Sequence, residues 1–463
     1  MIEPTCTGPV AGEAVTTLGA FDLGTYGYVS EEWWIEGVAT SRRASGLTDD
    51  DGRWETEKDA EAAYKTRLIV CRPSDPRRSS GSVVIEWLNV SGGGDGSPDW
   101  FFLHRELMRA GSIWVGVSAQ KAGIDGGGLL GTGSNLKAVA PERYATLSHP
   151  GDAFAYDIYT QAGAVLRRSD GPLAGFPMEA VLAVGESQSA VFLVTYVNAF
   201  DHDAAVYDGF LIHGRGSSGA SLDGNMLGED GEIIFSGSQK IREDARVPVI
   251  TVQSETDLVM MYGIRGRQDD SARFRWWEIA GAAHFDTYGL IASQSDDGSL
   301  PPAELAAQLA PPEEFLGIKL PGPMNSGPQQ HYVLNAAVRH LDAWVRHKTP
   351  PPKAERIVSE DTDEPVLVRD EFGIARGGIR TPWVDTPIAV LSGQGHEGEV
   401  FAQIFGSTSA FDSEQLASMY PGGREEYLAL FEKSVNSAIA AGFLLPEDRD
   451  EIIALGKAAC PIS

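Results

Sequence analysis

Basic residues are scarce in this sequence. Its 463 residues include 37 Lys and Arg against 65 Asp and Glu, so the formal net charge at pH 7 is −28. Nucleic-acid binding needs clustered Lys and Arg that neutralise phosphates, and anionic membrane surfaces attract basic segments. The charge balance therefore argues against both partners, and we interpret it as a surface that favours solubility.

Long hydrophobic runs are also missing. None approaches the roughly 18 consecutive apolar residues of a membrane helix, so we expect no membrane insertion. The first residues, MIEPTCTGPVAGEAV, lack a basic region followed by an apolar run. This argues against a secretory signal, with a trimmed signal as the alternative.

Cysteine is rare, and three cysteines cannot all pair within one chain. Cys71 lies in an apolar run and is expected in the core. Cys6 and Cys460 can pair only if the two ends of the chain meet. The simplest expectation is a reduced, cytoplasmic protein.

Several cofactor and metal motifs are absent. The sequence contains no GxxxxGK[ST] phosphate loop, no HExxH zinc pair and no paired CxxC. The Gly-rich run 123–135 lacks a phosphate-binding pattern and is expected to be a mobile loop near the pocket mouth, with a plain surface loop as an equal alternative. We therefore predict neither a cofactor nor a metal ion.

Short apolar runs rich in β-branched residues recur along the chain, flanked by Gly, Pro or Ser. Helical patterns lie between several of them. Strands buried on both faces and alternating with helices indicate an α/β protein with a doubly wound, mostly parallel sheet. The predicted strands are 66–73, 82–89, 112–119, 180–185, 209–214, 247–254 and 274–281, and the predicted helices are 98–110, 152–168 and 187–200.

Two longer segments interrupt this rhythm, 215–246 and 286–330, and their Gly, Pro, Ser and Asp content favours lid-like insertions. An amphipathic helix over 331–347 ends before a proline run. We expect a core domain over 1–352, with N-terminal strands and both insertions. A C-terminal extension, 353–463, is expected to pack on it, with helices near 412–421, 424–441 and 446–459.

The sharpest local signal is AVLAVGESQSAVFLV, an apolar strand that leads through Gly185-Glu186-Ser187-Gln188-Ser189 directly into a helix. This is the context of a nucleophile elbow, in which small residues two before and two after the serine permit a tight turn. We predict Ser187 as the nucleophile. The amide of Gln188, at a helix N-terminus, is predicted to donate to an oxyanion hole. The alternative is a turn with a helix-capping serine.

A serine nucleophile needs a base, which is itself oriented by an acid. After strand 247–254 come Glu255 and Asp257, and after strand 274–281 comes His284. The order serine, acid, histidine predicts a catalytic triad of Ser187, Asp257 and His284, with Glu255 as the alternative acid. His213 precedes both acids and is the weaker candidate for the base.

The loop after strand 82–89 is rich in glycine, which lets backbone amides approach a substrate closely. We predict the second oxyanion donor at Val90, with Asn89 and Ser91 as neighbouring alternatives. Aromatic side chains beside these loops are candidates for an apolar pocket, although ordinary core or rim packing is the favoured explanation for most of them. They are Trp87, Trp100, Phe101, Trp276, Trp277 and Phe285.

The sequence resembles a family of bacterial α/β-hydrolase-domain proteins. The phrases that carry this resemblance include YGYVSEEWWIEGVA, VVIEWLNVSGG, the GESQS elbow, VPVITVQSETDLV, WWEIAGAAHFD and GGIRTPWVDTPIA, and they cover most of the chain. The resemblance implies an α/β-hydrolase fold and a cofactor-free, esterase- or lipase-like serine hydrolase. It points to Ser187, His284 and an acid within 255–257. Ser189 departs from the glycine usual at that elbow position.

Together these observations predict a carboxylic ester hydrolase that works through an acyl-enzyme on a small-molecule ester. An acyltransferase with the same triad and a catalytically silent binding protein on the same fold are the alternatives. The physiological ester and the oligomeric state stay open.

Overall fold

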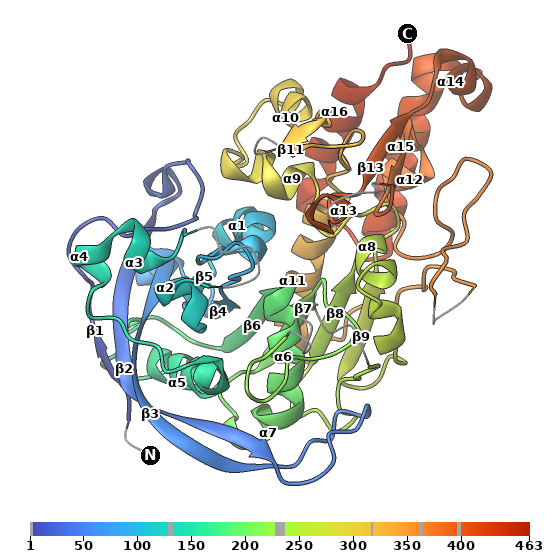
Figure 1. Cartoon of the computed structure of the whole chain (residues 1–463). Coiled ribbons are helices and arrows are strands. Elements are labelled where there is room, and N and C mark those ends of the chain that lie inside the picture. Colours follow the sequence, from blue (N-terminus) through green and yellow to red (C-terminus); the bar gives the residue numbers. More distant parts are fainter. Residues whose placement is uncertain (1–2, 128–132, 227–236, 316–317, 361–363, 396–399) are drawn as a thin grey trace.

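The computed structural model describes residues 3–127, 133–226, 237–315, 318–360, 364–395 and 400–463. A nine-stranded sheet crosses the molecule in the order β1-β2-β3-β5-β4-β6-β7-β8-β9 (Figure 1). Neighbours from β5 to β9 are parallel, and β1, β2 and β3 are antiparallel to their neighbours. The strands are β1 Thr5–Thr7, β2 Tyr28–Ala44, β3 Thr56–Pro73, β4 Ser82–Trp87, β5 Ile113–Val117, β6 Ala180–Glu186, β7 Gly209–His213, β8 Val249–Gln253 and β9 Phe274–Glu278.

Helices cover both faces of the sheet, which is why its central strands are buried throughout. In β4, Val83 and Ile85 pack into one core with helices α5 (Ala155–Leu166) and α6 (Gln188–Ala199). Val84, between them, packs into a second core with α1 (Pro98–Ala110) and α11 (Gln329–His347). Successive side chains of a strand point to opposite faces, so each β4 residue is buried. The structure thus confirms the predicted doubly wound α/β architecture.

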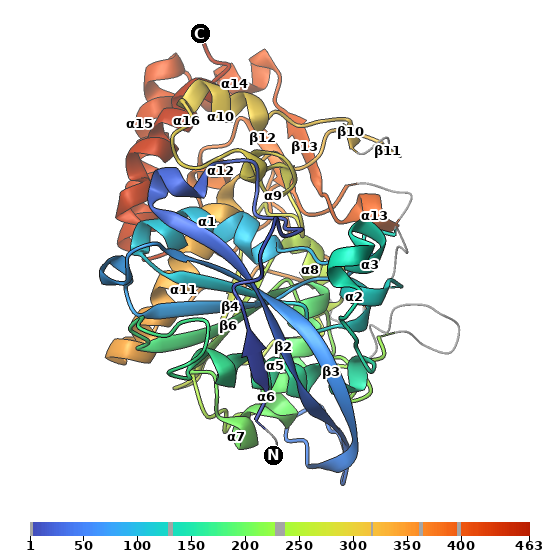
Figure 2. The same cartoon turned by 90° about the vertical axis from the view of Figure 1, so that its left-hand side faces the viewer.

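The N-terminal strands β2 and β3 form a long hairpin. β2 has 17 residues and β3 has 18, whereas β4 to β9 have five to seven each. Figure 2 shows this hairpin in blue, extending past the shorter strands. Its outer half is rich in Ala, Glu and Lys, residues of low strand propensity, which hides the pairing from a pattern search.

The chain order of the strands creates a crevice beside β4. From β4 the chain passes to β5 on one side, and it later returns to form β6 on the other. Loops that leave the carboxyl ends of β4 and β6 therefore diverge, and ligands bind at such a switch point in open α/β sheets. The two loops carry the segments 88–96 and 186–188, which include the predicted oxyanion loop and the elbow.

The two predicted insertions differ in content. The described parts of 215–246 contain no helix or strand, and residues 227–236 lie outside the described ranges. By contrast, the described part of 286–330 contains short regular elements. These are α9 Thr287–Leu290, α10 Pro302–Gln308, β10 Glu314–Phe315 and β11 Ile318–Lys319.

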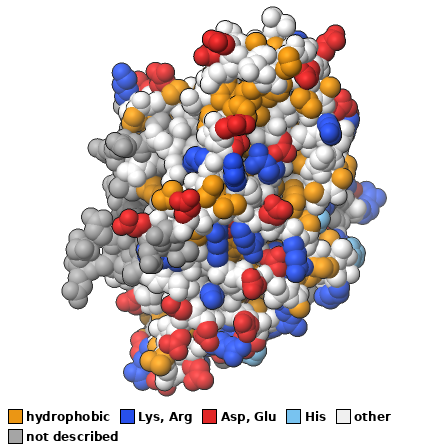
Figure 3. Space-filling model, turned by 90° about the vertical axis from the view of Figure 1, so that its right-hand side faces the viewer, with side chains coloured by type: hydrophobic (Ala, Val, Ile, Leu, Met, Phe, Trp, Pro, Cys, Tyr) orange, Lys and Arg blue, Asp and Glu red, His pale blue; other side chains and the backbone are white. Residues whose placement is uncertain are grey.

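One face of the molecule carries charges of both signs. Figure 3 shows Lys and Arg interspersed with Asp and Glu, and apolar side chains gathered near the top of that face. Despite the net charge of −28, this face therefore presents no uniform acidic field. No helix in the described ranges has the length and apolar character needed to cross a bilayer. Cys6, Cys71 and Cys460 are free.

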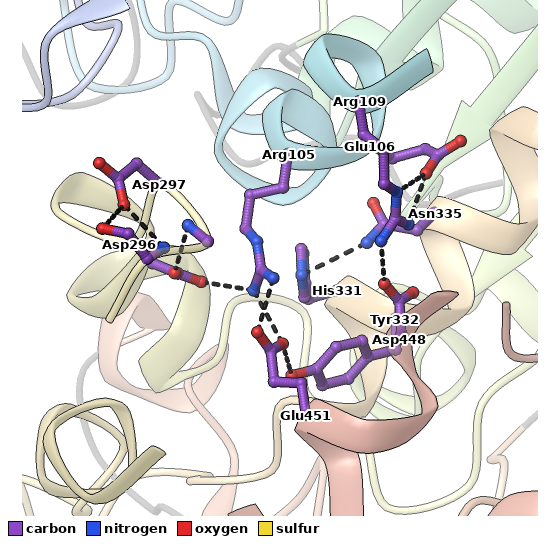
Figure 4. A network of polar contacts seen from close by, with 12 residues as sticks. Arg105, Glu106, Arg109, Asp296, Asp297, His331, Tyr332, Asn335, Asp448 and Glu451 are labelled. Carbon is purple, nitrogen blue, oxygen red and sulfur yellow. Dashed lines mark hydrogen bonds and ion pairs between the residues drawn. The ribbon is translucent and has the colours of Figure 1, made fainter. Parts of the chain in front are cut away.

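The predicted C-terminal helices appear as α14 Ser413–Met419, α15 Gly423–Ala440 and α16 Arg449–Ala459. Figure 4 shows Arg105 of α1 between Asp296 and Glu451, and Tyr332 of α11 donates to the same Glu451 carboxylate. An ionic network thus joins this extension to the helices that cover the sheet. The other short elements are α2 Lys121–Asp125, α3 Leu136–Val139, α4 Pro141–Tyr144, α7 Asp201–Ala204, α8 Glu255–Val259, α12 Pro382–Asp385, β12 Ala389–Ser392, α13 Val400–Gln403 and β13 Ser407–Ala410.

Candidate active site

Ser187 lies between β6 and α6 with a φ of 58° and a ψ of −117°. Residues other than glycine rarely adopt such backbone angles, and holding a residue in them costs about 1–3 kcal/mol. The surrounding backbone fixes the turn, since Ser187 N donates to His213 O (2.9 Å) and Ser187 O accepts from Val191 N (3.1 Å). A Cβ atom at Gly185 would lie 3.1 Å from Ser189. A side chain at position 185 would therefore force its neighbours to shift, which explains why a small residue is favoured there.

Three predicted residues meet above the carboxyl ends of β6, β8 and β9. Nε2 of His284 lies 2.8 Å from Ser187 Oγ, and Nδ1 lies 2.5 Å from Asp257 Oδ1. In the neutral imidazole, Nδ1–H donates to Asp257 and Nε2 accepts the serine proton. The structure brings together the three residues that the strand order predicted.

A helix cap holds the carboxylate of Asp257. Ser254 caps α8, its Oγ accepting from Asp257 N, while Ser254 N donates to Asp257 Oδ2 at 2.5 Å. Burial opposes ionisation, but attraction to His284 and these hydrogen bonds keep the pKa of Asp257 below its usual value. The acid is thus fixed in the form that orients an imidazole.

The alternative candidates face other groups. Glu255 accepts from Gly281 N (2.7 Å) and pairs with Arg369 (3.1 Å). His213 is buried with its Nδ1 at 3.0 Å from Asp99 Oδ1. The structure therefore places neither residue in the position of the acid or the base beside Ser187.

The predicted oxyanion donors lie close together, but the backbone amides of Val90 and Ser91 already donate hydrogen bonds within the protein. Gln188 N begins α6, as expected, whereas Val90 N donates to the side-chain oxygen of Gln188 at 3.1 Å. Ser91 N donates to Asn89 Oδ1 at 2.8 Å. For Val90 to stabilise an oxyanion, a substrate oxygen has to replace the Gln188 oxygen.

A cavity of about 330 Å³ opens beside Ser187. Its described lining includes no Asp, Glu, Lys, Arg or His side chain. Apolar residues and small polar ones share the wall. The lining residues are Thr48, Trp54, Ser91, Ser187, Gln188, Val191, Gly216, Ser218, Gly219, Ala220, Ser221, Leu222, Asn225, Met226, Gln239 and Met261.

None of the aromatic residues suggested by the sequence lines this cavity. Trp87, Trp100, Trp276 and Trp277 are buried in the two cores, and Phe101 and Phe285 pack at the edge of one of them. The core or rim packing that we expected for most of these rings is therefore confirmed. The aromatic in the cavity wall is Trp54, from the distant β2–β3 connection.

Glu186 is the acidic neighbour that the sequence analysis missed. Its Oε1 lies 3.1 Å from His284 Nε2, and its side chain is 4% exposed. Burial raises the pKa of Glu186 to about 7. Burial alone would lower the pKa of His284, but the carboxylates of Glu186 and Asp257 outweigh it and raise this pKa to about 9. The available signal was a charged residue at the end of an otherwise apolar strand.

No group of three His, Cys, Asp or Glu side chains suited to a metal ion occurs in the described ranges. The site is built from a serine, two carboxylates, an imidazole and backbone amides at a strand-to-helix turn.

Together, the sheet order, the crevice at β4 and β6 and the elbow define an α/β-hydrolase architecture. The profile of a family described as alpha/beta hydrolase domain matches residues 4–454. The chain belongs to this family.

Comparison with curated proteins finds no match. Among solved structures, a thermostable esterase from Pseudomonas putida is similar at 15% identity, with 63% of this chain and 82% of that chain covered and a TM-score of 0.32. A putative dienelactone hydrolase from Klebsiella pneumoniae shares 14% identity over 48% of this chain and 73% of that chain, with a TM-score of 0.26. A glucuronoyl esterase from Solibacter usitatus shares 11% identity over 53% and 66%, also with a TM-score of 0.26.

Proposed function

We propose that this protein is a carboxylic ester hydrolase that works through a Ser187–His284–Asp257 triad. The observation that carries the proposal is the continuous hydrogen-bonded path from Asp257 Oδ1 through both imidazole nitrogens to Ser187 Oγ. The path ends on a serine held at positive φ at a helix N-terminus. This backbone conformation has no benefit for a serine with a purely structural role. For a nucleophile it exposes the hydroxyl and places it beside an oxyanion site.

The proposed reaction has two acyl-transfer steps. His284 takes the Ser187 proton while Oγ attacks the ester carbonyl, and Asp257 stabilises the imidazolium that forms. The amides of Gln188 and Val90 donate to the oxyanion once the substrate oxygen displaces the Gln188 side chain. His284 then protonates the leaving alcohol. Water, activated by the same imidazole, releases the acid and restores Ser187.

The cavity supports small, uncharged esters as substrates. Its volume is near the lower end of the roughly 300–1,000 Å³ typical of ligand pockets. Its described wall contains no charged side chain to pair with a charged substrate, and burying an unpaired charge is costly. We propose that one side of the ester is a short acyl or small aromatic group that contacts Trp54, Leu222 and Met226.

Two further assignments belong to this proposal. Residues 1–352 form the catalytic core, and 353–463 form an extension packed on it. Contacts from the extension to the catalytic turns, including the ion pair between Arg369 and Glu255, support treating both parts as one functional unit.

The deciding experiment compares Ser187→Ala with wild type on p-nitrophenyl esters. Loss of the nucleophile is expected to lower kcat by 10⁴-fold or more, on the order found for other serine triads. A fluorophosphonate probe should label wild type on the peptide that contains residue 187 and should not label the variant.

Ser189→Ala is the matched control, because in the described structure the buried Ser189 hydroxyl makes no hydrogen bond. It should keep both turnover and labelling. Full turnover by folded Ser187→Ala would refute the proposed function. Product analysis with an added alcohol separates hydrolysis from acyl transfer, since an acyltransferase would form the new ester in preference to the free acid.

A further inference from the structure

His284 Nε2 has two oxygen neighbours, Ser187 Oγ at 2.8 Å and Glu186 Oε1 at 3.1 Å. One nitrogen carries either one proton or one lone pair. A neutral imidazole can accept the serine proton, and a protonated one can donate to Glu186. The two neighbours therefore favour opposite protonation states of the same atom.

We propose that Glu186 is a positioning residue that acts through His284, holding the imidazole protonated in the resting site and so setting the pH at which the triad becomes active. The inference rests on the proposed function. It goes beyond it by assigning a fourth residue to the proton relay.

The way Glu186 is held supports this role. It ends the fully buried strand β6, and the Asn89 amide donates to its backbone oxygen at 3.1 Å. Glu186 Oε2 accepts from Asn89 Nδ2 at 3.4 Å, whereas in the described part of the chain Glu186 Oε1 makes no hydrogen bond and has only the ion-pair contact with His284 Nε2 at 3.1 Å. A buried carboxylate without a partner is strongly unfavourable. The imidazolium of His284 is the group placed to compensate it, so this carboxylate oxygen is committed to His284.

Other ionisable groups near Glu186 and His284 also affect the pKa values of these two residues. Asp257 of α8 lies on the opposite side of the His284 ring. His213, at the end of β7, and Asp99 of α1 form a second buried pair that acts on Glu186. Burial raises the pKa of Asp99, and the Asp99 hydrogen bond raises the pKa of His213 against the effect of burial. Two carboxylates, those of Glu186 and Asp257, thus act on the His284 imidazole.

The proton balance follows from this geometry. In the resting pair, His284 carries a proton on Nε2 and Glu186 is ionised. Moving this proton onto Glu186 Oε1 breaks the N–H bond and forms an O–H bond. At higher pH the same proton is released to solvent instead. In both cases Nε2 is left with a free lone pair, which can accept the Ser187 proton. After attack, the imidazolium forms again next to the Glu186 carboxylate or carboxylic acid and protonates the leaving alcohol.

Removing the charge of Glu186 should shift the pH dependence of activity in one definite direction. An ionised Glu186 favours the charged imidazole, so its removal lowers the pKa of His284. Activity requires the neutral imidazole, so the acidic limb of the kcat/KM profile should move to lower pH.

The test is Glu186→Gln, which keeps the side-chain shape and removes the charge. The acidic limb of kcat/KM is expected to shift down by about one pH unit or more, since one unit corresponds to the effect of a close charge. The pH dependence of Ser187 labelling by a fluorophosphonate, and the imidazole nitrogen chemical shifts of His284, should shift equally. Glu186→Asp, with a retained but shorter carboxylate, should give an intermediate value.

Glu255→Gln is the matched control, because it neutralises a buried carboxylate near the same turn that pairs with Arg369 instead of the imidazole. It should leave the limb in place. If Glu186→Gln, or Glu186→Asp should the first variant not fold, leaves the limb and the His284 shifts unchanged, the inference is wrong. This failure is separate from that of the proposed function, which depends on Ser187→Ala alone.

Discussion

At Ser187 the unfavourable backbone angles are balanced by contacts with residues close in the chain and with His213 of the neighbouring strand β7. Gly185 and Ser189 leave room for the turn, and His213 and Val191 hydrogen-bond the backbone of Ser187. Local signals of this kind are visible in a sequence, which is why the elbow could be predicted from one apolar strand followed by small residues.

Which of two acidic residues lies next to His284 was harder to predict from the sequence than the turn at Ser187. Glu255 and Asp257 are both within reach of a strand end, and sequence spacing alone only favoured Asp257. The capping box with Ser254 turns Asp257 toward the imidazole, while Arg369 and Gly281 hold Glu255. Arg369 is distant in the chain, so this part of the distinction could not be predicted from local patterns.

We predict that Asp257→Asn lowers kcat by about 10⁴-fold, the effect of losing the group that fixes the tautomer of a catalytic histidine. Ester hydrolysis by the purified variant measures this change. Glu255→Gln should cost stability but retain kcat within about tenfold, because its contacts are structural. The reverse result would identify Glu255 as the acid.

At the scale of elements, the turn that carries His284 rests against both α8 and the C-terminal extension. The hydroxyl of Thr256 accepts from His284 N at 3.1 Å and donates to Gly393 O at 2.6 Å. Asn325 bridges Gly281 O and Ser392 O. The extension thus supports the turn that carries His284, although its sequence carries no catalytic signature.

Thr256→Val is expected to lower both stability and kcat, because it leaves two buried backbone groups without partners. Each such group costs about 1–3 kcal/mol. Urea denaturation measures the free energy of unfolding, and steady-state kinetics measures kcat.

Thr251→Val, in β8, is the matched control, since in the described structure the buried Thr251 hydroxyl has no hydrogen-bond partner. Its removal should be neutral or stabilising. Equal effects of the two substitutions would show that the Thr256 hydroxyl does not support the catalytic turn.

At the scale of the whole molecule, the helical periodicity of residues beyond 412 was enough to locate α14, α15 and α16. Their docking was not predictable, because it depends on pairs between distant segments. Arg105 on α1 contacts Glu451 on α16 at 2.6 Å, and Arg109 contacts Asp448 at 2.6 Å (Figure 4). Charges that look like ordinary surface residues in the sequence become partners only in the folded chain.

Glu451→Gln should lower the free energy of unfolding by about 2–4 kcal/mol, because it leaves Arg105 with less compensation in a largely buried position. Thermal and urea denaturation would both register the loss.

Glu432→Gln removes an exposed ion pair with Arg449 and should cost less than about 1 kcal/mol. If the Glu451 variant were as stable as the Glu432 variant, the network would not contribute to docking the extension.

The β2–β3 hairpin has a final consequence for selectivity. Thr48 and Trp54, which line the cavity, both lie in its connection between Ala44 and Thr56. Two residues of the cavity wall are thus supplied by a hairpin connection that is far in sequence from Ser187, Asp257 and His284. If the protein is the proposed ester hydrolase, shortening this connection or replacing its side chains should change which esters are preferred and leave the chemical step unchanged.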